Sequence, residues 1–472
     1  MIDPAMMHLL GKGDAMSIDF GQDFFFGAAT SAYQIEGAAH EDGKEESIWD
    51  EFCRVPGAIA NGEDGLVAAD HYHRYREDVG LMADLGLNAY RFSVSWPRVL
   101  NGDRLNSRGL DFYSRLVDEL LAKDVTPWLT LYHWDLPAAL PGGWTNRDTA
   151  ARFVDYATAL HARLGDRVRI WTTLNEPWCS SFLSYAGGHH APGRTDPVAA
   201  IRAAHHLLLA HGWTIRALRE LDPEARLGIT LNFTPALPAS ADPADVDVAR
   251  RLDGTHNRYF IEPIFTGAYP ADVLADLAAI WPADLVADTD LADIAQPIDV
   301  LGVNYYTTNL VAAPAPGAVA PSGPTPDITA PEAVRVSRGL PLTSMGWEVD
   351  PDGFRDLLVR LHTDYTGPAG VPLVVTENGA AYDDQPDAGG FVDDTADRVA
   401  YLKDHLRAAH QAIGQGVDLR GYLAWSFLDN FEWAYGYAMR FGLVRVDEHQ
   451  RRIPKASARW FAEVARTGRF AE

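Results

Sequence analysis

Pro372 to Gly379 reads Pro-Leu-Val-Val-Thr-Glu-Asn-Gly, a short apolar run that leads directly into the carboxylate of Glu377. The run is partly β-branched and ends at the turn signal Asn378-Gly379. Such a run is typical of a strand buried on both faces of a parallel sheet. Folds of this class place their chemistry at the carboxyl ends of the strands, which is where Glu377 would lie. The alternative is a surface glutamate that begins an Asn-Gly turn.

Seven further apolar runs have the same pattern, and amphipathic segments lie between many of them. The runs cover residues 24–29, 88–94, 126–132, 168–174, 226–231, 298–303 and 419–424. The segments predicted to be helical are 71–85, 109–123, 147–164, 197–221 and 395–414. Alternation of strands with helices implies right-handed βαβ units and a parallel sheet, and eight such units close into a barrel. We therefore predict an α/β fold, a single (β/α)8 TIM barrel with long βα loops.

Polar and aromatic side chains recur where these runs end. They are Gln34, Arg91, His133, Asn175, Glu176, Asn232, Asn304 to Tyr306, Glu377 and Trp425. Because the carboxyl ends of barrel strands meet at one rim, we expect these side chains to form a single pocket. Residues 312–331 and 383–390 lack periodicity and are predicted to be long loops. No change in composition divides the chain, so residues 17–472 are predicted to form one catalytic domain.

The composition argues against several classes of partner. A formal net charge of −25 disfavours nucleic acid and anionic membrane surfaces, because both bind basic patches. No apolar run of about 18 residues occurs, so we expect no transmembrane helix. Two cysteines, Cys53 and Cys179, are too few for a disulfide scaffold or a four-thiolate zinc site, and they favour a reducing, cytoplasmic location. Residues 1–16 lack signal-peptide features and are interpreted as a disordered or leader segment.

Histidines at 71–73, 189–190 and 205–211 invite a metal-site interpretation. His71 and His73 are two apart on a predicted helix and do not share a face, which argues against a joint site. We interpret all of these histidines as packing or loop residues and expect no metal or organic cofactor. Cys179 is interpreted as a small buried residue and not as a nucleophile.

A second stretch, Trp171 to Pro177, also ends in a carboxylate, that of Glu176. The residue before a proline is disfavoured in helices, so Glu176 should close its strand. Two carboxylates that face each other across a sugar-sized gap can break a glycosidic bond, one as nucleophile or base and the other as acid. This requires environments that hold one carboxylate ionised and leave the other protonated.

The residues near each carboxylate suggest how the two differ. Asn175 and the aromatic ring of Trp178 flank Glu176 and are expected to raise its pKa. Arg91 and the segment Asn304 to Tyr306 are expected to lie near Glu377 and keep it ionised.

Six stretches, taken together and in order, resemble glycoside hydrolase family 1, the retaining β-glucosidases. The resemblance spans residues 24–461, and the matching stretches are 26–37, 90–98, 132–137, 173–177, 376–379 and 425–433. It implies a (β/α)8 barrel and double displacement without metal or cofactor. Glu377 would be the nucleophile and Glu176 the acid/base, with carboxyl groups about 5–5.5 Å apart.

The resemblance also implies roles for residues around the two carboxylates. Arg91 and Tyr306 would support the nucleophile, and Asn175 would bind the 2-hydroxyl of the sugar. The remaining implied substrate-binding residues are Gln34, His133, Trp134, Asn304, Trp347, Trp425, Glu432, Trp433 and Phe441. Core packing for Trp425 and Trp433, and a strand-end role for His133, are the alternatives.

The expected activity is hydrolysis of terminal non-reducing β-D-glucosyl residues in small β-glucosides and short β-gluco-oligosaccharides, including those of cellulose degradation. A carboxylate at Glu432 would repel a 6-phosphate, so phospho-β-glycosidases are disfavoured. Plant thioglucosidases carry Gln where this chain has Glu176. A β-galactosidase or β-fucosidase of the same family, and a non-catalytic carbohydrate-binding relative, remain as alternatives. Oligomeric state is left open.

Overall fold

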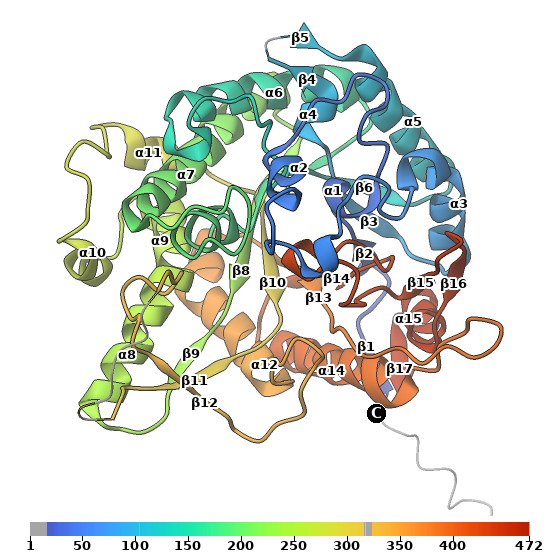
Figure 1. The fold of residues 1–472 in the computed structure, drawn as a ribbon. Helices are drawn as coiled ribbons and strands as arrows, with labels where there is room; N and C mark the ends of the chain where they lie inside the picture. The colour runs from blue at the N-terminus through green and yellow to red at the C-terminus, as the bar shows by residue number, and fades with distance from the viewer. Residues whose placement is uncertain (1–16, 103, 316, 318–322, 472) are drawn as a thin grey trace, which may run out of the picture.

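At the centre of the protein eight parallel strands close into a barrel (Figure 1). The computed structural model describes residues 17–102, 104–315, 317 and 323–471. The barrel strands, in chain order, are β2 (Phe25–Ala29), β3 (Ala89–Ser93), β6 (Thr126–Tyr132), β7 (Ile170–Asn175), β8 (Arg226–Phe233), β10 (Val300–Tyr305), β13 (Leu373–Asn378) and β14 (Leu419–Trp425). Each coincides within two residues at either end with one of the eight apolar runs. The predicted (β/α)8 barrel is confirmed.

Helices surround the barrel (Figure 1). The longer ones are α3 (His71–Asp84), α5 (Ser107–Ala122), α6 (Asp148–Leu164), α7 (Pro197–Leu221), α8 (Pro243–Asp253), α9 (Tyr259–Thr266), α12 (Pro351–Leu361), α14 (Ala400–Gly414) and α15 (Ala456–Thr467). All five predicted helices are among them. Helix α7 begins where predicted because the side chain of Asp196 accepts hydrogen bonds from the first free backbone amides and Pro197 occupies the first turn.

Shorter elements decorate the barrel. The short helices are α1 (Ala32–Ile35), α2 (Ile48–Cys53), α4 (Trp96–Val99), α10 (Ala271–Leu277), α11 (Asp290–Ile294) and α13 (Gly367–Ala369). The outer strands are β1 (Ser17–Asp19), β4 (Leu100–Asn101), β5 (Arg104–Leu105), β9 (Ala236–Pro238), β11 (Asn309–Ala312), β12 (Val334–Val336), β15 (Val444–Val446), β16 (Arg452–Pro454) and β17 (Arg469–Ala471). Strands β1 and β17 pair antiparallel and so join the two ends of the described chain.

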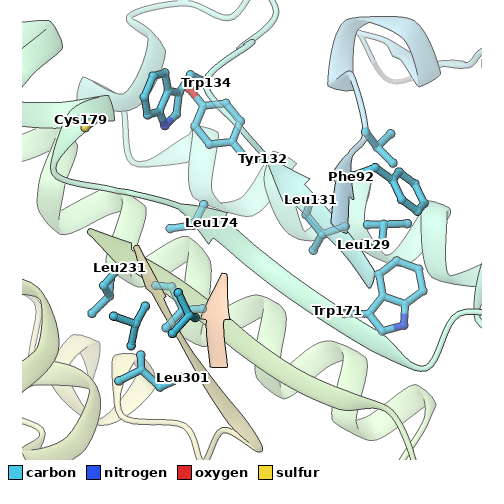
Figure 2. Packing of buried hydrophobic residues seen from close by; sticks show 14 of the residues in the cluster. Phe92, Leu129, Leu131, Tyr132, Trp134, Trp171, Leu174, Cys179, Leu231 and Leu301 are labelled. Carbon is cyan, nitrogen blue, oxygen red and sulfur yellow. The ribbon is translucent and has the colours of Figure 1, made fainter. Parts of the chain in front are cut away.

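The two largest apolar clusters lie on opposite sides of the barrel wall, one inside and one outside. The inner cluster takes one residue from each of six strands: Ala89, Trp128, Ile170, Val300, Val374 and Leu423. Residues from opposite strands meet only near the barrel axis, so this cluster fills the interior. Leu129, Leu131 and Leu174 belong to the large outer cluster, part of which Figure 2 shows. Because Ala89 and Arg91 are two apart on β3, Arg91 shares the inward face and lies one layer nearer the rim.

The two predicted long loops are confirmed over their described residues. Residues 313–315, 317 and 323–331 carry no helix or strand, and neither do residues 383–390. The predicted leader, residues 1–16, lies outside the described residues. Over the part of the chain that the structure describes, no helix is long and apolar enough to cross a membrane.

Candidate active site

A pocket of about 1200 Å³ opens at the carboxyl ends of the barrel strands. Both carboxylates of the proposed pair line it. Nine other residues selected from the sequence also line it: His133, Trp134, Asn304, Tyr306, Trp347, Trp425, Glu432, Trp433 and Phe441. The three remaining ones, Gln34, Arg91 and Asn175, are buried directly behind the lining and hydrogen-bond to it. The structure thus brings all fourteen predicted residues together.

Irregular backbone places the two carboxylates at the rim. The pairing register of β7 with β8 shifts just before Asn175, and Glu176 adopts a left-handed φ of 50°. The register of β13 shifts against both of its neighbours around Glu377. Such irregularities re-aim side chains beside active sites, and positive φ at a non-glycine residue is strain that the surrounding fold must hold. Trp134 and Trp433, also in the pocket, have φ of 83° and 50°.

Both oxygens of Glu377 are held by donors. Arg91 Nη1 donates to Oε1 over 2.6 Å, and the hydroxyl of Tyr306 donates to Oε2 over 2.8 Å. The other end of the Arg91 guanidinium donates to Asn175 Oδ1 over 2.6 Å. Burial raises the pKa of Glu377, while the charge and hydrogen bond of Arg91, followed by the hydrogen bond of Tyr306, lower it.

Glu176 has donors of a different kind. Asn304 Nδ2 donates to Oε1 over 2.7 Å, and the thiol of Cys179 lies 3.2 Å from Oε2. Burial, followed by the negative charge of Glu377, raises the pKa of Glu176 to about 8. The cation of the pair bonds to Glu377, so the proton that the two carboxyl groups share near neutral pH resides on Glu176.

One detail of the expected neighbourhood is wrong. Tyr305 does not approach Glu377, because its hydroxyl donates to the backbone oxygen of Asp350 on the outer side of the barrel. Asn304 pairs with Glu377 on the sheet and lowers its pKa by hydrogen bonding, as expected, and its side-chain amide also donates to Glu176 Oε1. The register shift at Asn304 turns the side chain toward the neighbouring carboxylate. The pKa of Glu176 is raised as expected: burial is the main cause, and the like charge of Glu377 adds to it.

A second polar group lies across the pocket at Glu432. Gln34 Nε2 donates to Glu432 Oε2 over 3.2 Å and to Asn430 Oδ1 over 3.0 Å, which joins the first barrel loop to the last. Burial, followed by the charge of Glu377, raises the pKa of Glu432 to about 8. Around it the rings of His133 and Trp433 stack with 24° between their planes. A carboxylate between flat rings is a surface that can take both the hydroxyls and the apolar face of a sugar.

Comparison with known proteins decides the family. The model of glycosyl hydrolase family 1 matches residues 16–470. The chain belongs to glycosyl hydrolase family 1. It is 49% identical to the thermostable beta-glucosidase B of Thermobispora bispora, over 97% of this chain and 93% of the relative. It is 47% identical to a bifunctional beta-D-glucosidase/beta-D-fucosidase of Bifidobacterium breve, over 94% of this chain and 98% of the relative.

A solved structure supports the same assignment. The crystal structure of a psychrophilic beta-glucosidase from Micrococcus antarcticus superimposes with a TM-score of 0.90 at 51% sequence identity, covering 94% of this chain and 97% of that one. Similarity at this level over nearly the whole length shows that this family 1 chain shares the (β/α)8 fold and is a glycosidase.

On the outer side of the family 1 pocket, the ring of Trp347 lies 5.3 Å from that of Tyr306 and 6.4 Å from that of Phe441, measured between ring centroids. Four of the large apolar side chains that are more than a third exposed also line this pocket: Val55, Val336, Leu342 and Tyr435. The entrance therefore presents apolar surface to solvent, next to the polar groups at the bottom.

Two contributors were missed from the sequence. Asn430 lies within the stretch 425–433 but is not among the predicted site residues, and its side-chain oxygen accepts a hydrogen bond from Gln34. Cys179 was correctly read as buried, but its contact with Glu176 was not foreseen. A spacing of three residues after the glutamate was the only signal for that contact.

The histidines selected as non-metal residues have other partners. Nδ1 of His71 lies 2.7 Å from Asp78 Oδ2, and Nε2 of His205 lies 2.9 Å from Asp290 Oδ2. Within the described ranges, no group of three or more His, Cys, Asp or Glu side chains could hold a metal ion.

Proposed function

We propose that this chain is a retaining β-glucosidase that releases terminal non-reducing β-D-glucosyl residues through a covalent glycosyl-enzyme intermediate. The observation that carries this proposal is the difference between two carboxyl groups in one pocket. Glu377 is bonded to a guanidinium and a phenol, and Glu176 is bonded to neutral groups that leave it protonated. A nucleophile and an acid are the two groups that retaining hydrolysis needs.

In the first step, Glu377 attacks the anomeric carbon while Glu176 gives its proton to the glycosidic oxygen. The bond from that carbon to the leaving group breaks, and its electron pair stays with the leaving oxygen. In the second step, Glu176 takes a proton from water, whose oxygen attacks the same carbon and displaces Glu377. Arg91 and Tyr306 stabilise the carboxylate that is consumed and regenerated. No metal or organic cofactor is required, because the pair supplies acid, base and nucleophile.

The other predicted residues are proposed to contact the substrate. Gln34 and Glu432 would accept and donate hydrogen bonds to the hydroxyls farthest from the bond that is cleaved. Asn175, held by Arg91, would bind the 2-hydroxyl. The remaining residues on the glycone side are His133, Trp134, Asn304, Trp425 and Trp433, and Trp347 with Phe441 would border the leaving group.

A second glycone has specific support. The Bifidobacterium breve relative is named as both a β-D-glucosidase and a β-D-fucosidase, so we propose β-fucosidase activity as a side activity. β-Galactosidase activity is kept as a weaker alternative. A non-catalytic, sugar-binding role is disfavoured because both carboxylates and their hydrogen-bonding partners are complete.

The biological setting is also part of the proposal. Small β-glucosides and short β-gluco-oligosaccharides such as those of cellulose degradation are the proposed substrates, and residues 17–472 are proposed to be one catalytic domain. A cytoplasmic location is supported by Cys53 and Cys179, which are both free thiols.

A panel of p-nitrophenyl β-glycosides, with cellobiose beside it, tests the assignment. The highest kcat/KM is expected for the glucoside, and a lower but measurable value for the fucoside. Proton NMR of the products should show the β-anomer of glucose first and the α-anomer only later, through mutarotation. Early appearance of the α-anomer would contradict the retaining mechanism.

A further inference from the structure

The hydrogen-bond network identifies which oxygen of Glu176 carries the acidic proton. A guanidinium only donates, so Asn175 Oδ1, which faces Arg91 Nη2 at 2.6 Å, must be the amide oxygen. Asn304 Nδ2 lies 3.1 Å from that oxygen and must therefore be the amide nitrogen. The hydroxyl of Thr376, which donates to Asn304 Oδ1 over 2.7 Å, fixes the same orientation.

It follows that Glu176 Oε1 is always an acceptor. Asn304 Nδ2 donates to it over 2.7 Å, and an amide NH2 group has no acceptor capacity. The carbonyl oxygen of a neutral carboxyl group is its stronger acceptor, so the proton of neutral Glu176 resides on Oε2, the oxygen that Asn304 does not bond. The side chain 3.2 Å from Oε2 is the thiol of Cys179, which is buried and lines the pocket.

Local backbone geometry holds this thiol in place. The amide of Cys179 donates to the carbonyl oxygen of Glu176 over 3.0 Å, which closes a turn between the end of β7 and the π-helical segment η4 (Cys179–Ala186). The side chains of Glu176 and Cys179, at the two ends of this turn, face each other, and both line the pocket. Burial, followed by the charge of Glu176, holds the pKa of the thiol well above its usual value, so it stays protonated.

We propose that Cys179 is a positioning residue whose hydrogen bond with Glu176 Oε2 reverses direction during the reaction. This inference rests on the proposed function. In the free enzyme the Oε2–H of protonated Glu176 donates to the sulfur, and it turns to the glycosidic oxygen when substrate binds. When Glu176 has given that proton to the leaving oxygen and become a carboxylate, the S–H donates to Oε2. Both states are compatible with a thiol, which is a weak donor and a weak acceptor, and neither requires the thiol to lose its proton.

The consequence concerns the pKa of Glu176 in both steps. The S–H bond to the carboxylate lowers that pKa, against the larger effects of burial and of Glu377 that raise it. Without the thiol, ionised Glu176 loses a hydrogen-bond donor and becomes less stable relative to protonated Glu176, so the pKa of Glu176 should rise. The same rise should appear in the free enzyme, where Glu176 is the acid, and in the glycosyl-enzyme, where it is the base.

Three variants test the proposal: Cys179→Val, which removes the hydrogen bond and keeps an apolar side chain of similar size; Cys179→Ser, which keeps a donor and acceptor; and Cys53→Ser, the matched control at the other cysteine. For Cys179→Val, the basic limb of kcat/KM with cellobiose should move upward by about half a pKa unit. The acidic limb of kcat with 2,4-dinitrophenyl β-glucoside, for which the second step limits the rate, should move upward by a similar amount. Cys179→Ser should shift neither limb upward, and Cys53→Ser should reproduce the parent profile.

The outcomes separate this inference from the proposed function. If the parent enzyme does not hydrolyse either glucoside, the proposed function is wrong. If it does hydrolyse them and the Cys179→Val profile superimposes on the parent profile, the proposed role of Cys179 is wrong. A loss of rate with both limbs unmoved, or an equal upward shift in Cys179→Ser, would show a packing role only and would also overturn it. Thermal unfolding shows whether each variant is folded. If Cys179→Val does not fold, Cys179→Ala takes its place.

Discussion

The guanidinium of Arg91 lies 2.6 Å from Glu377 Oε1, and both side chains are almost completely buried. A buried ion pair contributes little net stability by itself, but removal of one partner leaves an uncompensated charge. The pair therefore matters less for the stability of the folded chain than for which carboxylate is ionised.

Arg91→Met should destabilise the fold at pH 8 by about 3–5 kcal/mol, because the Glu377 carboxylate would remain buried without its cation. Chemical denaturation followed by tryptophan fluorescence measures the change. The double variant Arg91→Met/Glu377→Gln removes the charge as well and should regain most of the loss. Equal stabilities of the single and double variants would contradict the pairing.

Glu377→Ala should lower kcat for p-nitrophenyl β-glucoside by at least about 10³-fold, since the group that forms the covalent bond is gone. Added azide should restore turnover and yield α-glucosyl azide, because a small anion would attack from the face that Glu377 occupied. The anomeric configuration of the product is read by NMR. Formation of the β-azide would place the nucleophile elsewhere.

Glu176→Gln should distinguish substrates by their leaving groups. Without an acid, release of a poor leaving group such as the sugar of cellobiose should slow by about 10²–10⁴-fold, the usual contribution of general acid catalysis. Release of 2,4-dinitrophenolate needs no proton and should show a rapid burst followed by slow hydrolysis of the intermediate. A uniform loss across both substrates would argue against the acid role.

The ionisation of Glu176 should also appear in stability. The pKa of Glu176 is about 8 in the folded protein, above its ordinary value of 4.5, so the folded state binds the proton more tightly than the unfolded state. Its contribution is thus fully present below pH 4.5 and is lost as pH rises through about 8. Glu176→Gln cannot ionise, and its Tm relative to the parent should be higher at pH 8.5 than at pH 5. A Tm difference that does not change with pH would mean that Glu176 is not protonated when buried.

The apolar entrance should favour apolar leaving groups. Leu342 lines the pocket and is 58% exposed, whereas Leu221, at the end of α7, is 59% exposed and does not line it. Leu342→Ser should raise KM for octyl β-glucoside by roughly fivefold, about 1 kcal/mol of lost apolar contact, and leave KM for methyl β-glucoside unchanged. Leu221→Ser is the matched control and should alter neither. An equal effect of the two substitutions would exclude a specific contact at the entrance.

Much of this architecture was already determined by the sequence. Apolar runs such as Leu373 to Thr376 are buried on both faces, so hydrophobic burial alone specifies them as inner strands. Burial of a charged carboxylate in the apolar interior is costly, so a carboxylate at the end of such a run must lie at the open rim. For that reason the sequence alone identifies Glu176 and Glu377 as a pair, and the amphipathic pattern of the segments between the strands predicts the helices.

Only the tertiary structure decided which partner each carboxylate has. Hydrogen-bond assignment depends on shifts of a single residue in strand register, and these shifts leave no mark in hydrophobic periodicity. With these shifts Asn304 bonds to Glu176 and Arg91 bonds to Glu377, while the turn that follows β7 brings the thiol of Cys179 to the oxygen that carries the proton. Residues identify the reaction, but distances of about 3 Å between side chains from different strands determine which carboxyl group is the acid.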